Sequence, residues 1–333
     1  MVKILSLLSA ALLATIISAE TVYTGEIIDK VKVANKIDIN DLPEHTHTRL
    51  WLEMPRSHNG QSWHLPVLIT KGSNEGKRVF LNSGTYGNSL NGIRAVQKVL
   101  NDVDPKKVKG AVVGIPGLNM NGMLLNKHRW FSQSGPGSLI DLNQYFPGST
   151  EGDDIDQFLA SLWENLIINN KFNAAVDFQS LANGNASPIF AHADTNVTYV
   201  NKMVELSGVD VVINKPGDPK SGNLDDTLNA AGVPTITFQL GNPRLFELGV
   251  IQKAYDKPHI TDAKYIRANS GGLVDVIVEL NQVVQQDQVV GTMYDPHGDV
   301  VEIYKAPVKG KVFAFNSDPL REPGSLIVAI AVM

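Results

Sequence analysis

Strand-length apolar runs alternate with amphipathic helical patterns through the middle of this 333-residue chain. No other feature of the sequence constrains the fold as much. The apolar runs lie at residues 78–82, 111–115, 174–178, 209–213 and 235–240. Helical spacing places two apolar sets on common faces, namely Ile93, Val96, Val99 and Leu100, and Ile155, Phe158, Leu159, Leu162 and Leu166. This alternation predicts an α/β domain whose strands lie in a mixed β-sheet flanked by helices.

The pattern changes at both ends of this region. Before it, residues 30–39 and 48–54 alternate in short stretches near prolines, which predicts exposed or edge strands. After it, strand-like runs follow one another between Gly, Pro, Asn and Asp turns, at residues 273–280, 289–294, 300–306, 311–315 and 325–332. We therefore predict an N-terminal β segment at residues 20–44, an α/β domain at 45–262 and a small all-β module at 263–333.

The first nineteen residues have the pattern of a removable signal peptide. Lys3 supplies a short positive start, residues 4–17 are largely apolar, and Ser18-Ala19 gives a small-residue cleavage site. The apolar run is shorter than the roughly 18 to 20 residues that a bilayer span requires, which disfavours a membrane anchor. We predict that residues 1–19 are removed and that the mature protein is secreted, with no attachment to the membrane.

Charge and cysteine content exclude several classes of function. The net charge is -5 and the pI is near 5.9, without a long run of lysine or arginine, so nucleic acid is not an expected partner. The chain has no cysteine, which excludes disulfides, thiolate nucleophiles and zinc sites built with cysteine. Sequons at Asn185 and Asn196 predict a glycoprotein if the source is eukaryotic.

Four loops that follow predicted strands hold the residues most relevant to function, because sites in open α/β sheets form at strand ends. They read G-T-Y-G-N-S-L-N-G at 84–92, N-K-H-R at 126–129 with D-L-N-Q-Y-F-P-G at 141–148, D-F-Q at 177–179 and T-F-Q-L-G at 237–241. In order and spacing they resemble the loops of the succinylglutamate desuccinylase/aspartoacylase-like family, within the zinc carboxypeptidase superfamily. The resemblance extends over nearly all of the mature chain. It implies a zinc-carboxypeptidase-like fold with a small C-terminal β module, and the activity of a zinc-dependent deacylase.

The residues that bind zinc in that family are replaced here. The family motifs are G-x-H-G-x-E-x-x-G, D-L-H and a glutamate in a V-E-L-G-like context. Carried over by position, the resemblance puts the zinc-binding histidine at Tyr86, the zinc-binding glutamate at Ser89 and the second histidine at Gln179. Phenol, hydroxyl and amide groups are poor zinc ligands. The catalytic glutamate falls at Gln239, whose amide does not accept a proton near neutral pH. We therefore predict a protein without zinc or another cofactor, and we assign no catalytic residue among these four positions.

Part of the family's substrate-binding set is kept. The resemblance implies that Arg129 and Asn143 hold a carboxylate or carbonyl group, whereas the arginine of the family's D-L-N-R-x-F-P-G motif has become Gln144. A guanidinium group can hold a carboxylate with two parallel hydrogen bonds, so Arg129 is the best candidate anchor. The alternative is that Arg129 forms an ordinary salt bridge at the surface.

Three functions are compatible with these residues. The first, favoured by the loss of all four family residues, is a secreted pseudoenzyme that binds a small polar or carboxylate-bearing ligand without zinc-dependent hydrolysis. The second is a metal-free enzyme of the isomerase, lyase or cyclase type that uses the same residues. The third is a zinc-dependent hydrolase of amide or ester bonds with displaced ligands, which would have to come from His128, His192, Asp177 and Asp194.

Overall fold

The computed structural model describes residues 20–57, 59–132, 139–182, 185–209, 211–244, 247, 259–296 and 298–333. The predicted signal peptide, residues 1–19, lies outside the described residues. Within the described ranges, no helix has the length and apolar character needed to cross a membrane.

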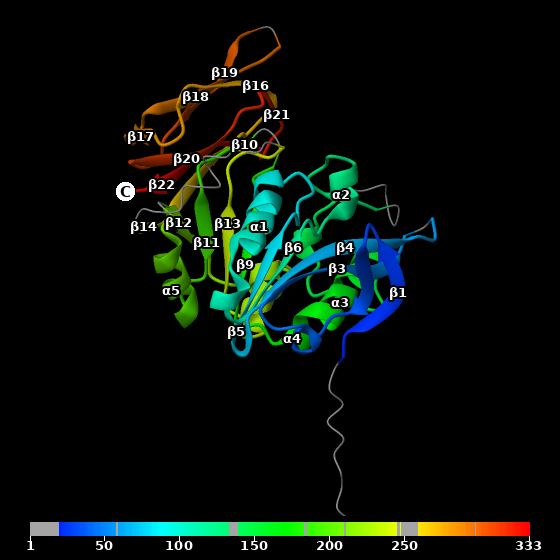
Figure 1. Ribbon diagram of the computed structural model, residues 1–333. Coiled ribbons are helices and arrows are strands. Elements are labelled where there is room, and N and C mark those ends of the chain that lie inside the picture. Colours follow the sequence, from blue (N-terminus) through cyan, green and yellow to red (C-terminus); the bar gives the residue numbers. More distant parts are fainter. Residues whose placement is uncertain are drawn as a thin grey trace, which may run out of the picture.

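A mixed 11-stranded sheet forms the centre of the fold, in the order β1-β2-β3-β4-β6-β5-β9-β13-β11-β12-β14 (Figure 1). Its strands are β1 (Val22–Ile28), β2 (Val31–Lys36), β3 (Thr46–Arg56), β4 (Ser62–Lys71), β5 (Ser73–Ser83), β6 (Lys109–Pro116), β9 (Ala174–Gln179), β11 (Phe190–Ala193), β12 (Val211–Asn214), β13 (Thr235–Gln239) and β14 (His259–Thr261). The five apolar runs of the central region form β5, β6, β9, β12 and β13. The sequence pattern did not reveal β4, which contains a proline, or β11, which has only four residues.

The N-terminal strands continue this sheet. β1 is an exposed edge strand, paired with β2, as expected for the start of this segment. The expectation that residues 30–39 are exposed or at an edge was wrong, because β2 lies between β1 and β3 and buries Val33 and Ala34. The expectation that residues 48–54 are exposed or at an edge was wrong, because β3 lies between β2 and β4 and buries Leu50, Leu52 and Met54. The alternation that made this stretch look half-exposed is the inward and outward alternation of an internal strand.

Helices cover both faces of the sheet. One face carries α1 (Leu90–Asp102) and α5 (Thr198–Ser207), and the other carries α3 (Asp154–Leu162) and α6 (Leu224–Ala230). A π-helical segment (Trp163–Ile167) joins α3 to α4 (Ile168–Asn170), and α2 (Met120–Leu124) follows β6. In α1, Ile93, Val96 and Leu100 are buried, but Val99 is 39% exposed. At 3.6 residues per turn, Val99 lies at the margin of the apolar stripe and not on it.

A separate all-β module closes the chain (Figure 1). A four-stranded sheet, in the order β19-β18-β16-β21, packs with a second sheet of β10, β20, β22, β15 and β17. Their bounds are β10 (Asn185–Ala186), β15 (Ala263–Arg267), β16 (Gly272–Val276), β17 (Val283–Val284), β18 (Val289–Tyr294), β19 (Val300–Lys305), β20 (Gly310–Asn316), β21 (Leu320–Arg321) and β22 (Leu326–Val332). The strand expected at 273–280 ends earlier, at Val276. The module contacts the α/β domain at β11, where the rings of Phe190 and Phe313 meet edge to face with centroids 5.1 Å apart.

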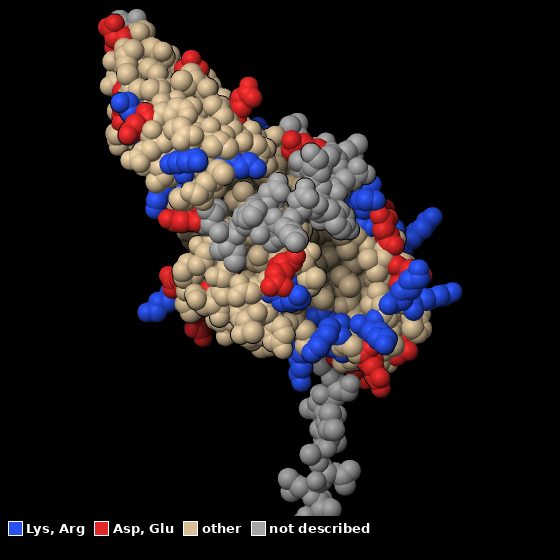
Figure 2. All heavy atoms as spheres, turned by 90° about the vertical axis from the view of Figure 1, so that its left-hand side faces the viewer, with Lys and Arg blue, Asp and Glu red and all other residues tan. Residues whose placement is uncertain are grey.

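Basic and acidic side chains lie next to one another over both parts of the molecule in the view of Figure 2. On this face, the described residues do not gather into a broad patch of one charge.

A short hairpin, β7 (Trp130–Phe131) with β8 (Leu139–Ile140), and the 3-10 turn Leu142–Gln144 lie on the connection that leads to α3.

Candidate functional site

A row of polar side chains crosses four adjacent strands of the central sheet. Asn82 on β5 pairs in register with Asp177 on β9, Asp177 with Thr237 on β13, and Thr237 with His192 on β11. Residues paired in register project to the same face of a sheet, so all four point the same way. Phe80 and Ala175, two residues earlier on β5 and β9, belong to the apolar core beneath α3 and α6. The row is therefore the place where that core becomes polar.

Hydrogen bonds link this row to the next. Asp177 is fully buried; its Oδ1 accepts from Asn82 Nδ2 at 2.8 Å and its Oδ2 from Gln179 Nε2 at 2.5 Å. Gln239 Nε2 in turn donates to Gln179 Oε1 at 3.0 Å. In its ionised form a carboxylate can only accept, so ionised Asp177 turns the NH₂ groups of both neighbouring amides toward itself. Sequence comparison singled out Gln179 and Gln239, and the structure brings them into direct contact.

The loop after β5 contributes Tyr86, whose ring stacks on His128 with centroids 3.8 Å apart. The Tyr86 hydroxyl is hydrogen-bonded to the side chain of Asn143, and Asn143 Oδ1 accepts from the backbone N–H of Leu224 at 3.0 Å. Burial, and then the charge of Asp141, raise the pKa of Tyr86 above its ordinary range, so the phenol stays protonated.

Ser89 has a structural role in the same loop. It is fully buried, and its Oγ accepts from the backbone N–H of Ser180 at 3.0 Å. This bond ties the start of α1 to the end of β9. The hydroxyl has no neighbouring base in the contacts described, which agrees with the weak sequence case for a serine nucleophile.

One buried and two partly buried titratable groups around the site, Asp177, His128 and His192, have shifted pKa values. Burial raises the pKa of Asp177 to about 7, against the opposing effect of its hydrogen bonds from Asn82 and Gln179. Burial also lowers the pKa of His128 to about 4, and that of His192 to about 4. Nearby cations add to the effect on both imidazoles. Near neutral pH the two histidines are therefore uncharged, while Asp177 is close to its midpoint.

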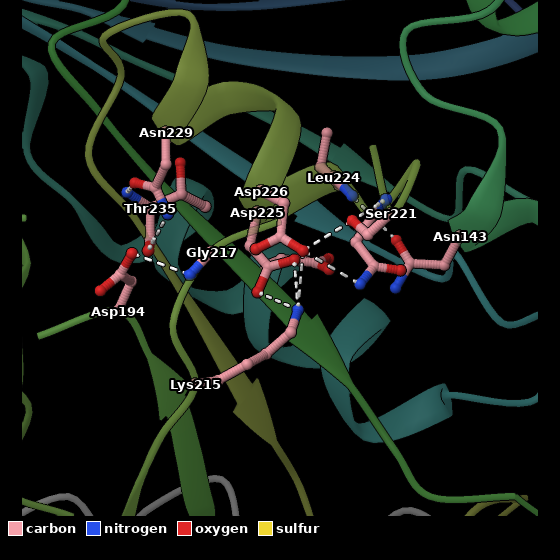
Figure 3. Close-up of polar contacts among 12 residues, drawn as sticks. Asn143, Asp194, Lys215, Gly217, Ser221, Leu224, Asp225, Asp226, Asn229 and Thr235 are labelled. Atoms are coloured by element: carbon pink, nitrogen blue, oxygen red, sulfur yellow. Dashed lines mark hydrogen bonds and ion pairs between the residues drawn. The ribbon is translucent and has the colours of Figure 1, made fainter. Parts of the chain in front are cut away.

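Lys215 is held by two aspartates (Figure 3), and its charge acts on His192 in the row. Lys215 follows β12, and its Nζ is 3.1 Å from Asp225 Oδ2 and 3.3 Å from Asp226 Oδ2 at the start of α6. Ser221 Oγ also donates to Asp226 Oδ2, at 2.6 Å. Asp194 is engaged elsewhere on this loop, where it accepts from the backbone N–H of Gly217 at 2.9 Å.

The three expected ligand-binding residues lie in different settings. Asn143 is buried at the site, next to Tyr86. Gln144 is exposed, and its Nε2 donates to Asp141 Oδ2 at 3.2 Å. Arg129 is exposed beside His128 and has no ion pair with any described residue, so the surface salt bridge considered as its alternative role is not formed there.

The residues at the family's zinc positions do not fit a zinc ion. Gln179 Nε2 donates to Asp177, and Gln179 Oε1 accepts from Gln239. Ser89 Oγ accepts from the backbone N–H of Ser180. Zinc requires imidazole, thiolate or carboxylate ligands, usually three of them. In the part of the chain that the structure describes, no three His, Asp or Glu side chains are grouped to hold a metal, so His128, His192, Asp177 and Asp194 do not form a displaced set.

Four buried polar atoms of the site have no hydrogen-bond partner among the described residues. They are Asn82 Oδ1, Thr237 Oγ1, His192 Nδ1 and Gln239 Oε1. Sequence reasoning missed Asn82, Thr237, Lys215 and Asp225. The only available signals were weak, since Asn82 ends an apolar run and Thr237 lies two residues before Gln239 on a predicted strand.

A family model and several known proteins agree with this architecture. The model of the succinylglutamate desuccinylase/aspartoacylase catalytic domain matches residues 75–255. An N-alpha-acetyl-L-2,4-diaminobutyric acid deacetylase of Halomonas elongata is 23% identical over 283 residues, covering 74% of this chain and 79% of that protein. The product-bound structure of the ectoine utilization protein EutE (DoeB) from Ruegeria pomeroyi superposes with a TM-score of 0.76 at 16% identity, covering 88% of this chain and 98% of that one.

A second solved structure supports the same fold. The succinylglutamate desuccinylase/aspartoacylase from Rhodobacter sphaeroides has a TM-score of 0.75 at 15% identity and covers 90% of this chain and 98% of its own. At such identities the likeness shows the fold alone. It confirms the predicted class, a mixed sheet flanked by helices with a small C-terminal β module.

Proposed function

Because this chain belongs to the succinylglutamate desuccinylase/aspartoacylase family, we propose that it keeps the site of these deacylases as a metal-free binding site for a small polar ligand. The observation that carries the proposal is the chain of hydrogen bonds from Asp177 through Gln179 to Gln239. By the resemblance, Gln179 and Gln239 replace a zinc-binding histidine and the catalytic glutamate. A water molecule in this place would meet neither a Lewis acid nor a base.

The ligand we propose carries a carboxylate. Arg129 supports this, since its exposed guanidinium group has no ion pair with a described residue and is adjacent in sequence to His128, which stacks on Tyr86. The curated relative is named for N-alpha-acetyl-L-2,4-diaminobutyric acid, a small carboxylate-bearing molecule, and one structural relative was solved with its product bound. A carboxylate at Arg129 would leave the rest of the ligand to be recognised by the buried amides.

We further propose that the protein acts outside the cell. The signal-like pattern of residues 1–19 supports export, and the exposed position of Asn196 is compatible with a glycan on its sequon. N-terminal sequencing of protein recovered from the medium would give Glu20 as the first residue. Recovery only from the cell interior, with Met1 intact, would reject this part of the proposal.

The deciding experiment for the binding function is metal content together with hydrolysis. Protein purified without chelator or added zinc is analysed by elemental mass spectrometry and assayed for release of acyl groups from N-acyl amino acids, with and without added zinc. We expect far less than one zinc per chain, a folded circular dichroism spectrum and no acyl release. Near-stoichiometric zinc with chelator-sensitive hydrolysis would overturn the proposal.

A second candidate, metal-free catalysis, is favoured by one observation. Asp177 is a buried carboxyl group whose pKa of about 7 suits proton transfer near neutral pH. The protonated phenol of Tyr86 can donate a hydrogen bond to a developing negative charge. A turnover that survives in Tyr86→Phe, Arg129→Ala and Gln239→Ala alike would not belong to this site.

A further inference from the structure

Three of the unpartnered atoms lie close together where β11 pairs with β13. Thr237 pairs in register with His192, and Gln239 is two residues further along β13 on the same face. Thr237 and Gln239 are 4% and 6% exposed, so neither Oγ1 nor Oε1 is satisfied by bulk water. Buried polar groups in native proteins nearly always have a partner, and three without one in the same place point to a bound molecule.

On the basis of the proposed binding function, we infer that Thr237, Gln239 and His192 form a subsite for a hydrogen-bond-donating, cationic head group of the ligand, a primary ammonium group. The ligand would thus be zwitterionic, with its ammonium group at β11 and β13 and its carboxylate at Arg129.

The direction of the amide chain fixes Gln239 as a hydrogen-bond acceptor in this subsite. Asp177 takes the NH₂ group of Gln179, so Gln179 presents its oxygen to Gln239. Gln239 must then use its NH₂ group on Gln179 and is left with Oε1 unpaired. On the other side of Asp177, the NH₂ group of Asn82 donates hydrogen bonds to both Asp177 and Thr85. The side-chain oxygen of Asn82 is therefore the atom left without a partner. An ammonium group supplies the donors that these oxygens lack, whereas a carboxylate does not.

The charges that surround the subsite differ between its two sides. Asp177 on β9, Asp225 on α6 and Lys215 after β12 all act electrostatically on the row, and Lys215 is already paired with both Asp225 and Asp226. Asp141 adds a further negative charge near Tyr86. At Asp177 the charge of Asp225 acts more strongly than that of Lys215, whereas at His192 the charge of Lys215 acts more strongly than that of Asp225. The part of the row toward Asp177 is therefore the part where the charges favour an ammonium group.

The test compares two probes of similar length, 4-aminobutyrate and glutarate, which differ by an ammonium group in place of one carboxylate. Binding to the mature protein is measured by isothermal titration calorimetry at up to about 10 mM probe, a range that detects weak binding. The same titrations are made with Thr237→Val, and with Thr235→Val as a matched control. Thr235 lies on the same strand, and its hydroxyl has its own partner, the carbonyl oxygen of Val233, at 2.8 Å.

We expect 4-aminobutyrate to bind more tightly than glutarate, and Thr237→Val to weaken it by about tenfold while Thr235→Val does not. Tighter binding of glutarate, or equal effects of the two valine variants, would overturn the ammonium subsite and leave the metal-free binding function standing. Binding of neither probe would also reject the subsite. Stoichiometric zinc with hydrolysis, the result that defeats the proposed function, is measured separately and does not depend on either probe.

Discussion

The ring of Tyr86 lies nearly parallel to the imidazole of His128, with an angle of 10° between the planes and 3.8 Å between the centroids. The imidazole Nδ1 is 3.0 Å from Asn88 Oδ1, so the loop after β5 is linked to His128 by a stack and a hydrogen bond. By the resemblance, Tyr86 occupies the place of a zinc-binding histidine. In this protein the Tyr86 hydroxyl is hydrogen-bonded to Asn143, and the stack of its ring on His128 holds the loop in position.

The stack predicts that Tyr86 matters more for its ring than for its hydroxyl. Tyr86→Phe removes the hydrogen bond with Asn143 and should lower the free energy of unfolding by about 1 kcal/mol. Tyr86→Ala also removes the ring and should cost about 3 kcal/mol or more. Urea unfolding followed by fluorescence measures both. Equal losses in the two variants would show that the ring contact stabilises nothing.

Restoring the family's acidic residue should destabilise this protein. Gln239→Glu places a carboxyl group against Gln179 and near Asp177, in a buried setting where the charged form is disfavoured. We expect a loss of about 3 kcal/mol at about pH 8, and much less at about pH 5, where the new group stays protonated. Thermal unfolding at the two pH values tests this. An effect that does not change with pH would mean that the new carboxylate is solvated or finds a partner.

The two uncharged histidines predict a loss of stability in acid. The pKa values of His128 and His192 are about 4 in the folded protein, below the ordinary value of 6.5. Between these values the unfolded chain binds protons that the folded chain does not, so stability is full above about pH 6.5 and falls as the pH is lowered toward about 4. His192→Asn should make this decline shallower in chemical unfolding curves. An unchanged decline would place the titration elsewhere.

Asp177 acts in the opposite direction. Its pKa is raised from 3.8 to about 7, so between these values the folded chain holds a proton that the unfolded chain has released. Its contribution to stability is therefore full below about pH 4 and is lost as the pH rises toward about 7. Relative to the parent protein, Asp177→Asn should become progressively more stable over this range. The same pH dependence of stability in Asp177→Asn and in the parent protein would place this titration elsewhere.

Arg129 should matter for the ligand and not for the fold. It is exposed and has no ion pair with a described residue, so Arg129→Ala should change the free energy of unfolding by less than about 0.5 kcal/mol. The same variant should weaken binding of carboxylate-bearing probes by about tenfold or more. Arg94→Ala, an exposed arginine on α1, is the matched control. If both variants bind alike, the proposed carboxylate contact is wrong.

Close packing of α1 on the sheet can be tested at Gly92. A Cβ atom there would lie 2.7 Å from the carbonyl oxygen of Phe178 on β9, a distance that requires the helix to move. Gly92→Ala should cost about 2 kcal/mol by overpacking, despite the better helix propensity of alanine. Gly271→Ala, where the nearest atom would be 3.4 Å away, is the control. Equal unfolding midpoints for the two variants would contradict this account.

The sequence by itself determined the local features of this protein. The α/β rhythm, the terminal β module and the replacements at Tyr86, Ser89, Gln179 and Gln239 follow from patterns within single segments, where side-chain periodicity reports directly on the buried face. A residue type at a known position also limits its chemistry, so an amide in place of a carboxylate could be interpreted without coordinates.

Only the tertiary structure decided what these residues meet. Asn82, Asp177, Thr237 and His192 come from segments up to 155 residues apart (237 minus 82), and they form a row because the strand order is β5-β9-β13-β11. β11 is four residues long and antiparallel to β13, so no local sequence pattern predicts its register with β13. Register between distant strands is set by how their side chains fill a shared core, which is a property of the assembled sheet and not of any one strand.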